Sequence, residues 1–164
     1  MKRFLRIATA ALVATSFAST AKAGDATADA GGDIISAVGL ANTSGLYFGS
    51  VVPGSTATGK ATVSHDGTLQ CDAVLTCLGD NISAARFVVS GEVGNTYEIT
   101  LPETITLTSG SDTMTVIQII ASSATGSIAA NGNDEFTVGG ALQVSAGQAA
   151  GNYTGTFVVN VDYN

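Results

Sequence analysis

The sequence predicts an all-β, immunoglobulin-like antiparallel β-sandwich that follows a cleaved N-terminal signal peptide. After the first 23 residues, valine, isoleucine, threonine, tyrosine and phenylalanine recur in short runs, as is typical of strands. Glycine-containing turn signals separate these runs at intervals of roughly ten residues, the spacing of a sandwich. Charged helix formers are scarce throughout this part of the chain. No segment after the signal peptide therefore favours a helix.

The first 23 residues have the features of a secretory signal peptide. A basic head with one lysine and two arginines precedes an apolar stretch over 7–17, and an A-x-A cleavage motif ends at Ala23. Cleavage between Ala23 and Gly24 would leave residues 24–164. The apolar stretch is shorter than the ~20 residues that cross a membrane, and no later stretch approaches that length. We expect export to the periplasm and then to the cell surface or the medium, with no membrane insertion.

The expected mature chain is strongly acidic. Removal of the signal leaves Lys60 and Arg86 as the basic residues against thirteen acids, a formal charge of −11. Such a surface repels nucleic acid and anionic lipid headgroups. We therefore expect neither as a partner.

The mature chain divides into a leader and one domain. Residues 24–32 are small and acidic and predict a mobile leader, and residues 33–164 predict the sandwich. Asp66-Gly67 lies between two apolar runs and predicts a two-residue hairpin loop. The expected strands span, in order, 33–40, 46–52, 59–65, 68–71, 85–91, 96–102, 103–108, 113–121, 135–145 and 153–163.

The last expected strand carries the most informative pattern. Side chains of a strand alternate between its two faces, so one face of 153–163 is rich in aromatic and apolar residues and the other in polar ones. The final strand of any antiparallel sandwich shows the same alternation, so the pattern alone leaves open what pairs with the strand. The apolar face holds Tyr153, Gly155, Phe157, Val159, Val161 and Tyr163, and the opposite face Thr154, Thr156, Val158, Asn160 and Asp162.

Two cysteines in an exported chain predict a disulfide. Cys71 and Cys77 would close a short loop, which stabilises the fold by about 2–2.5 kcal/mol in the chain-entropy estimate. A zinc site would lack ligands, since the chain offers two thiolates and one histidine. A redox role favours the closer C-x-x-C spacing. The disulfide is the reading that we adopt.

No motif predicts catalysis or a cofactor. His65 precedes a turn, and the G-x-S-x-G elbow of serine hydrolases is absent from the sequence. The acids are scattered, and no tryptophan is present to stack sugars as in a glycosidase. Residues 131–135 resemble a calcium loop in composition but lack the EF-hand spacing, so turn chemistry explains them better. We predict no catalytic residue, no metal and no cofactor, and we expect that the protein is not an enzyme.

Four segments of the chain, in this order, resemble an exported bacterial family known as domain of unknown function 4402. They are Leu46-Tyr-Phe-Gly-Ser-Val-Val-Pro-Gly54, residues 84–102, Thr113-Met-Thr-Val116 and residues 138–153. The resemblance covers essentially the whole mature chain, and residues 140–155 are its most specific part. It implies an all-β sandwich similar to pilins and fimbrial subunits. The cysteine pair departs from the family pattern and affects one loop.

The pilin resemblance implies assembly by donor-strand exchange. Fimbrial subunits resemble this chain in a glycine fourteenth from the end, here Gly151, and an aromatic residue second from the end, here Tyr163. In such proteins the groove beside the C-terminal strand accepts a strand from a periplasmic chaperone and then from the next subunit. The expected acceptor residues are Gly151, Tyr153, Phe157, Val159, Val161 and Tyr163.

Residues 33–40 fit the description of a donor strand. Their side chains alternate between two faces, and two glycines, Gly31 and Gly32, make the chain before them flexible. The face that would be donated holds Ile34, Ser36, Val38 and Leu40. The same residues also suit an ordinary first strand of the chain's own sandwich. We therefore expect a structural or adhesive surface subunit whose partners are other copies of itself or fimbrial subunits and a periplasmic chaperone. The alternative is a monomeric, self-completed periplasmic or secreted binding module.

Overall fold

The computed structural model describes residues 24–164. The expected signal peptide, which ends at Ala23, lies outside the described residues. The chain divides into a unit ending at Asp33, of which 24–33 are exposed and form no strand, and a folded unit over Ile34–Asn164. The folded unit is all-β and antiparallel, as the sequence predicts. No helix of the described part is long and apolar enough to cross a membrane.

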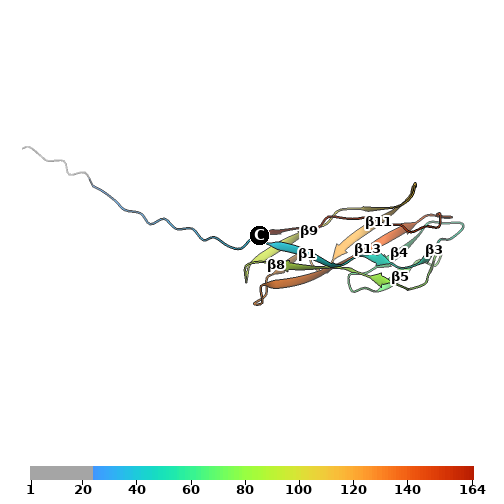
Figure 1. The fold of residues 1–164 in the computed structure, drawn as a ribbon, viewed down its shortest axis with the longest axis horizontal. Coiled ribbons are helices and arrows are strands. Elements are labelled where there is room, and N and C mark those ends of the chain that lie inside the picture. Colours follow the sequence, from blue (N-terminus) through green and yellow to red (C-terminus); the bar gives the residue numbers. More distant parts are fainter. Residues whose placement is uncertain (1–23) are drawn as a thin grey trace, which may run out of the picture. The chain divides into compact units, whose positions relative to one another are not determined.

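The largest sheet is built around one long strand, β13 (Asn133–Val144). On one edge β13 pairs first with β8 (Ala85–Ser90) and then with β4 (Gly59–Val63), and on the other edge it pairs with β11 (Asp112–Ala121). This sheet also contains β1 (Gly39–Ser44) beside β8, β5 (Leu69–Cys71) beside β4, and β10 (Ile105–Ser109) beside β11. Figure 1 shows β11 and β13 along the middle of the folded unit.

The exchange of partners along β13 requires glycine. Gly139 lies where the pairing passes from β8 to β4, and a Cβ there would collide with the backbone of Val63, Ser64 and His65. A glycine at such a close approach lets the strand bend and the sheet curl.

A second sheet and two short strand pairs complete the fold. β9 (Thr96–Thr100) lies between β12 (Thr125–Ser127) and β14 (Asn160–Tyr163). β2 (Tyr47–Phe48) pairs with β7 (Ile82–Ser83), and β3 (Val51–Val52) pairs with β6 (Thr76–Cys77). In Figure 1, β3 and β5 lie at the opposite end of the folded unit from the C-terminus.

The hydrophobic core forms two clusters. The first contains Phe48, Val63, Ile105, Met114, Val116, Leu142 and Val144, and the second contains Phe87, Val89, Tyr97, Ile99, Ile128, Phe136 and Val138. Phe157 packs against both clusters, and its ring meets the edge of Phe87 at 6.2 Å between centroids. Phe87 in turn stacks on Phe136 at 5.2 Å.

Several expected strands have different bounds in the structure. The strand expected over 46–52 divides into β2 and β3, because Gly49 has a φ of +69° and turns the backbone out of the strand direction. The strand expected over 33–40 begins only at Gly39. The sequence pattern did not reveal β6, β7 and β12, each two or three residues long.

The hairpin expected at Asp66-Gly67 is present with a longer loop. The ladder of β4 and β5 ends at Val63 and Leu69, and Ser64 N–H then donates to Thr68 O at 2.9 Å. Three residues therefore form the loop, with Gly67 at a φ of +84°.

Candidate functional site

The C-terminal segment is paired only at its two ends. Thr154 exchanges two backbone hydrogen bonds with Thr108 of β10, at 3.0 and 2.8 Å, and β14 pairs with β9. Between them, residues 155–159 make no backbone hydrogen bond within the described part of the chain. The strand expected over 153–163 is thus interrupted.

The interruption follows from the neighbouring chain. Between the end of β9 at Thr100 and the start of β10 at Ile105, that chain passes from the small sheet to the large one. Pro102 lies within this crossing and has no N–H to donate. The chain beside residues 155–159 thus changes sheets, and no continuous ladder forms there.

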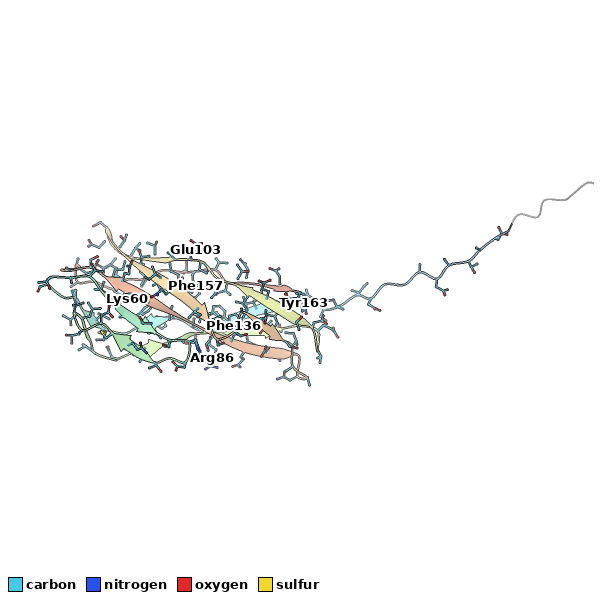
Figure 2. All side chains as sticks on the ribbon, turned by 180° about the vertical axis from the view of Figure 1, so that it is seen from behind. Lys60, Arg86, Glu103, Phe136, Phe157 and Tyr163 are labelled. Carbon is cyan, nitrogen blue, oxygen red and sulfur yellow. A yellow bond between two sulfur atoms is a disulfide. The ribbon has the colours of Figure 1, made fainter. Side chains whose placement is uncertain are left out.

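The side chains of this segment still alternate as the sequence predicts. Tyr153, Phe157, Val159, Val161 and Tyr163 are half-buried, whereas their neighbours are exposed. Gly155 differs from the expectation because it is exposed. Figure 2 labels Phe157 and Tyr163, two of the half-buried aromatic residues of this segment.

A groove opens between this segment and the chain that carries β2 and β3. It consists of two adjoining cavities of about 880 and 270 Å³ that share Leu46, Tyr47, Phe48, Leu107 and Gly155. We call it the edge groove and define its two sides as residues 42–53 and 148–157. Its floor is apolar and comes from the first core cluster: Phe48, Ile105, Met114, Val116, Leu142 and Val144.

Free backbone groups face this groove. Because Thr154 uses both its N–H and its C=O toward β10, the backbone groups of Tyr153 and Gly155 point to the opposite edge. Neither residue has a backbone hydrogen-bond partner among the described residues. The segment therefore presents an unpaired strand edge beside an apolar groove.

The Tyr153 hydroxyl bonds to the chain just before the last segment. It donates to Ala149 O at 2.9 Å and accepts from Gln148 Nε2 at 2.8 Å, while the same amide group reaches Thr113 O at 3.3 Å. A tyrosine that bonds back to the backbone a few residues upstream is the tyrosine corner, found near the start of strand F in immunoglobulin-like sandwiches. This bond holds the start of the last segment against the chain that precedes it.

Tyr163 lies away from the edge groove. Its hydroxyl accepts a hydrogen bond from Glu92 N–H at 2.8 Å and donates one to Ser36 O at 3.1 Å. Gly91 makes room for this hydroxyl, since a Cβ at that position would collide with it. Val159, Val161 and Tyr163 pack against the second core cluster. Of the expected acceptor residues, Gly151, Tyr153 and Phe157 line the groove.

The residues expected to form a donor strand are divided between two environments. Ile34 is fully exposed, with a relative exposure of 102%. Ser36 is exposed and accepts the Tyr163 bond, and Val38 packs against the second cluster. Leu40 belongs to β1 and lies opposite Val89 of β8. The described residues before Ser36 therefore form no strand and no hydrogen bond with their own domain.

The predicted disulfide is confirmed. Cys71 and Cys77 are bonded to each other with Cα atoms 6.2 Å apart, and the bond joins β5 to β6. Both sulfur atoms take part in this bond, so in this form the two cysteines are neither zinc ligands nor a free dithiol. Within residues 24–164, no group of three or more His, Cys, Asp or Glu side chains is placed to hold a metal.

The acidic turns have structural partners. Asn131 Oδ1 accepts from Asn133 N–H at 3.0 Å, which is turn chemistry, and Asp134 accepts from the buried Tyr97 hydroxyl at 2.9 Å. His65 is exposed in the β4–β5 loop. Beside it, the backbone N–H of Thr68 lowers the pKa of Asp66.

At the rim of the edge groove, Asp80 binds both the N–H and the hydroxyl of Ser50, each at 2.9 Å. These hydrogen bonds, the backbone one foremost, lower the pKa of the Asp80 carboxyl. A carboxylate thus fixes the turn between β2 and β3, which forms one side of the groove.

The model of one protein family, described as Domain of unknown function (DUF4402), matches residues 38–163. No curated protein and no solved structure matches the chain at a significant level.

Proposed function

Since the chain belongs to the DUF4402 family, whose description leaves function open, we propose a function from the edge groove. The protein is an exported structural or adhesive subunit of the cell surface, and a β-strand from another polypeptide completes its sandwich. In the periplasm a chaperone supplies that strand, and in the assembled, fimbria-like form another subunit supplies it.

The unpaired edge beside an apolar groove carries this proposal. An extended peptide that lies in the groove gains backbone hydrogen bonds from Tyr153 and Gly155 and places alternate side chains on the floor. An exposed edge of this kind is a liability that folded proteins normally cover. A function that requires an added strand explains why this one is open.

The size of the groove supports a long-lived joint. Each valine, leucine or isoleucine side chain buried from water contributes about 1.5–3 kcal/mol. Cavities of about 880 and 270 Å³ have room for several such side chains, and backbone hydrogen bonds add to them. An assembly formed this way would dissociate slowly.

The position of β1 bears on the alternative, a monomeric module that completes itself. Self-completion would place the N-terminal strand beside the C-terminal segment. Here β1 pairs with β8 in the large sheet, and the C-terminal segment pairs with β9 and β10. We therefore favour completion by a second polypeptide.

Hydrogen exchange tests the proposal on the intact mature protein. Purified protein is concentrated, and the monomer and any multimers are separated and compared. The backbone amides of Tyr153 and Gly155 should exchange freely in the monomer and become protected in the multimer. Asp162, in the β14–β9 ladder, is the internal control and should be protected in both. Absence of multimers at any concentration, or multimers with unprotected 153 and 155, would reject strand addition at this edge.

A further inference from the structure

We infer that the donated strand is residues 24–34 of a second copy, antiparallel to the acceptor's last strand, with Ile34 in the larger cavity. This inference rests on the proposed function and names the partner of the same groove. It moves the donor N-terminal to the 33–40 segment expected from the sequence.

The availability of the segment is the first argument. Residues 24–37 are exposed and form no strand, whereas Val38 packs on the second core cluster and Gly39 begins β1. Donation of Val38 and Leu40 would require them to leave their own domain. Donation of residues up to Ile34 requires no such loss.

The alternation of the segment is the second argument. Its even positions carry small apolar side chains that end in one large one: Ala26, Ala28, Ala30, Gly32 and Ile34. Its odd positions carry Asp25, Thr27, Asp29, Gly31 and Asp33. On an added strand the acidic face must remain in water, so the even face turns to the apolar floor. Ile34, not Ile35, then enters the groove.

The difference in size between the two cavities indicates the orientation of the donor strand. The larger cavity lies along residues 148–155 and the smaller one along 155–157. The donor has its one large side chain at its C-terminal end, and alanines before it. An antiparallel arrangement brings Ile34 to the larger cavity, and Ala26 and Ala28 to the smaller one.

The Tyr163 contact determines how successive copies meet. The hydroxyl holds Ser36 two residues after Ile34, so the donor leaves its own domain at the end where the C-terminus lies. Both residues of β3 line the larger cavity of the acceptor, and β3 lies at the opposite end of the folded unit from the C-terminus (Figure 1). Each copy therefore joins the next head to tail. A head-to-tail contact of this kind produces an open chain unless the rotation between successive copies closes a ring.

Cross-linking of paired cysteines in the full mature chain tests donor and orientation together. In the register that places Ile34 opposite Ala149, Thr27 lies beside Thr156 and Asp33 beside Ala150. All four substituted positions are exposed, and a short bismaleimide reacts with free thiols while the native disulfide stays intact. The antiparallel pairs are Thr27→Cys with Thr156→Cys and Asp33→Cys with Ala150→Cys. The parallel pairs are Thr27→Cys with Ala150→Cys and Asp33→Cys with Thr156→Cys.

We expect the antiparallel pairs to give a ladder of dimers, trimers and longer species on a denaturing gel, and the parallel pairs to give little. A ladder from the parallel pairs, or cross-linked monomers in place of a ladder, would overturn the inference. Multimers in which 153 and 155 are protected but no pair cross-links would show that the groove accepts a different strand. The proposed function would then stand and this donor would be wrong.

Substitution of the two isoleucines provides a matched comparison. Ile34→Asp places a charge on the face that enters the groove, and we expect at least a tenfold loss of multimer at equal concentration. Ile35→Asp adds the same charge to the acidic face and should leave the multimer fraction within about twofold. Both substitutions fall outside the strands and the core, so monomer folding is unaffected. Equal effects of the two variants would contradict the assignment of Ile34.

Discussion

Two tyrosine hydroxyls fix the two ends of the last segment and give those ends different roles. Tyr153 binds back to Ala149 and Gln148, which holds the start of the segment beside the edge groove. Tyr163 binds Ser36 and Glu92, which holds the chain just before β1 beside the end of the segment. The sequence predicted one apolar face for both. It could not separate their roles, because three of the four partners of these hydroxyls are backbone groups, which no side-chain pattern reveals.

Substitution Tyr153→Phe tests the tyrosine corner. The ring remains, but the hydrogen bonds to Ala149 O and from Gln148 are lost, each with a net value of about 0.5–1.5 kcal/mol. We expect the free energy of unfolding, measured with urea, to fall by about 1–2 kcal/mol. Tyr47→Phe is the control, because Tyr47 is 62% exposed, and it should change stability by less than about 0.5 kcal/mol. Equal losses in the two variants would mean that the corner contributes nothing of its own.

Tyr97 predicts a loss of stability at alkaline pH. Burial, together with the hydrogen bond to Asp134 and the charge of that residue, raises the pKa of the Tyr97 hydroxyl above its ordinary value of 10.0. The neutral form is therefore favoured in the folded state. Its contribution is fully present below the unfolded-state pKa of about 10 and is lost as pH rises from there toward the folded-state pKa.

Urea unfolding between pH 9 and about 11.5 measures this effect. Stability of the unmodified protein should decline with rising pH, and Tyr97→Phe should show a shallower decline. Tyr47→Phe should retain the original slope, since Tyr47 is exposed. A slope unchanged by Tyr97→Phe would place the alkaline sensitivity elsewhere.

At the scale of elements, the sequence predicted the strands that carry long alternation and missed those that depend on tertiary contacts. β8, β9, β11 and β13 lie within a few residues of their expected bounds. β6, β7 and β12 are too short for a period of two to be recognised. The last segment was predicted by its faces, but its interruption accompanies the change of sheet between β9 and β10, which are distant from it in the sequence. The edge groove likewise depends on how distant segments pack, so only one of its sides was predictable.

The disulfide makes a prediction at the same scale. It joins the last residue of β5 to the last residue of β6, which pairs with β3 at the rim of the edge groove. Replacing Cys71 and Cys77 together by serine should lower the free energy of unfolding by about 2–2.5 kcal/mol, the value for a loop of this length. Denaturant unfolding of the double variant, compared with the oxidised protein, measures the loss. An unchanged midpoint would mean that the short loop is already constrained without the bond.

At the scale of the whole molecule, assembly brings together copies that repel each other. The expected mature chain has a formal charge of −11, and the inferred donor adds Asp25, Asp29 and Asp33 to an acceptor whose groove rim carries Asp80. Burial of apolar side chains is not directional and does not depend on charge. Long-range repulsion should therefore slow the encounter of two copies, and apolar contacts should decide how long the joint lasts.

Ionic strength separates these two contributions. The screening length falls from about 30 Å at 0.01 M salt to about 8 Å at 0.15 M, so added salt should raise the association rate of purified protein at least severalfold. The dissociation rate should change little, because it reflects apolar burial and backbone hydrogen bonds in the groove. Light scattering after a concentration jump and after dilution gives the two rates.

The donor aspartates supply the matched variant for this experiment. Asp25→Asn, Asp29→Asn and Asp33→Asn together should raise the association rate at low salt and have a smaller effect at 0.15 M, where the same charges are already screened. Multimers that dissolve as salt rises would contradict the expectation. That result would mean that ion pairs involving Lys60 or Arg86 hold the copies together. The half-buried aromatic face of the last segment would then need another explanation than strand addition.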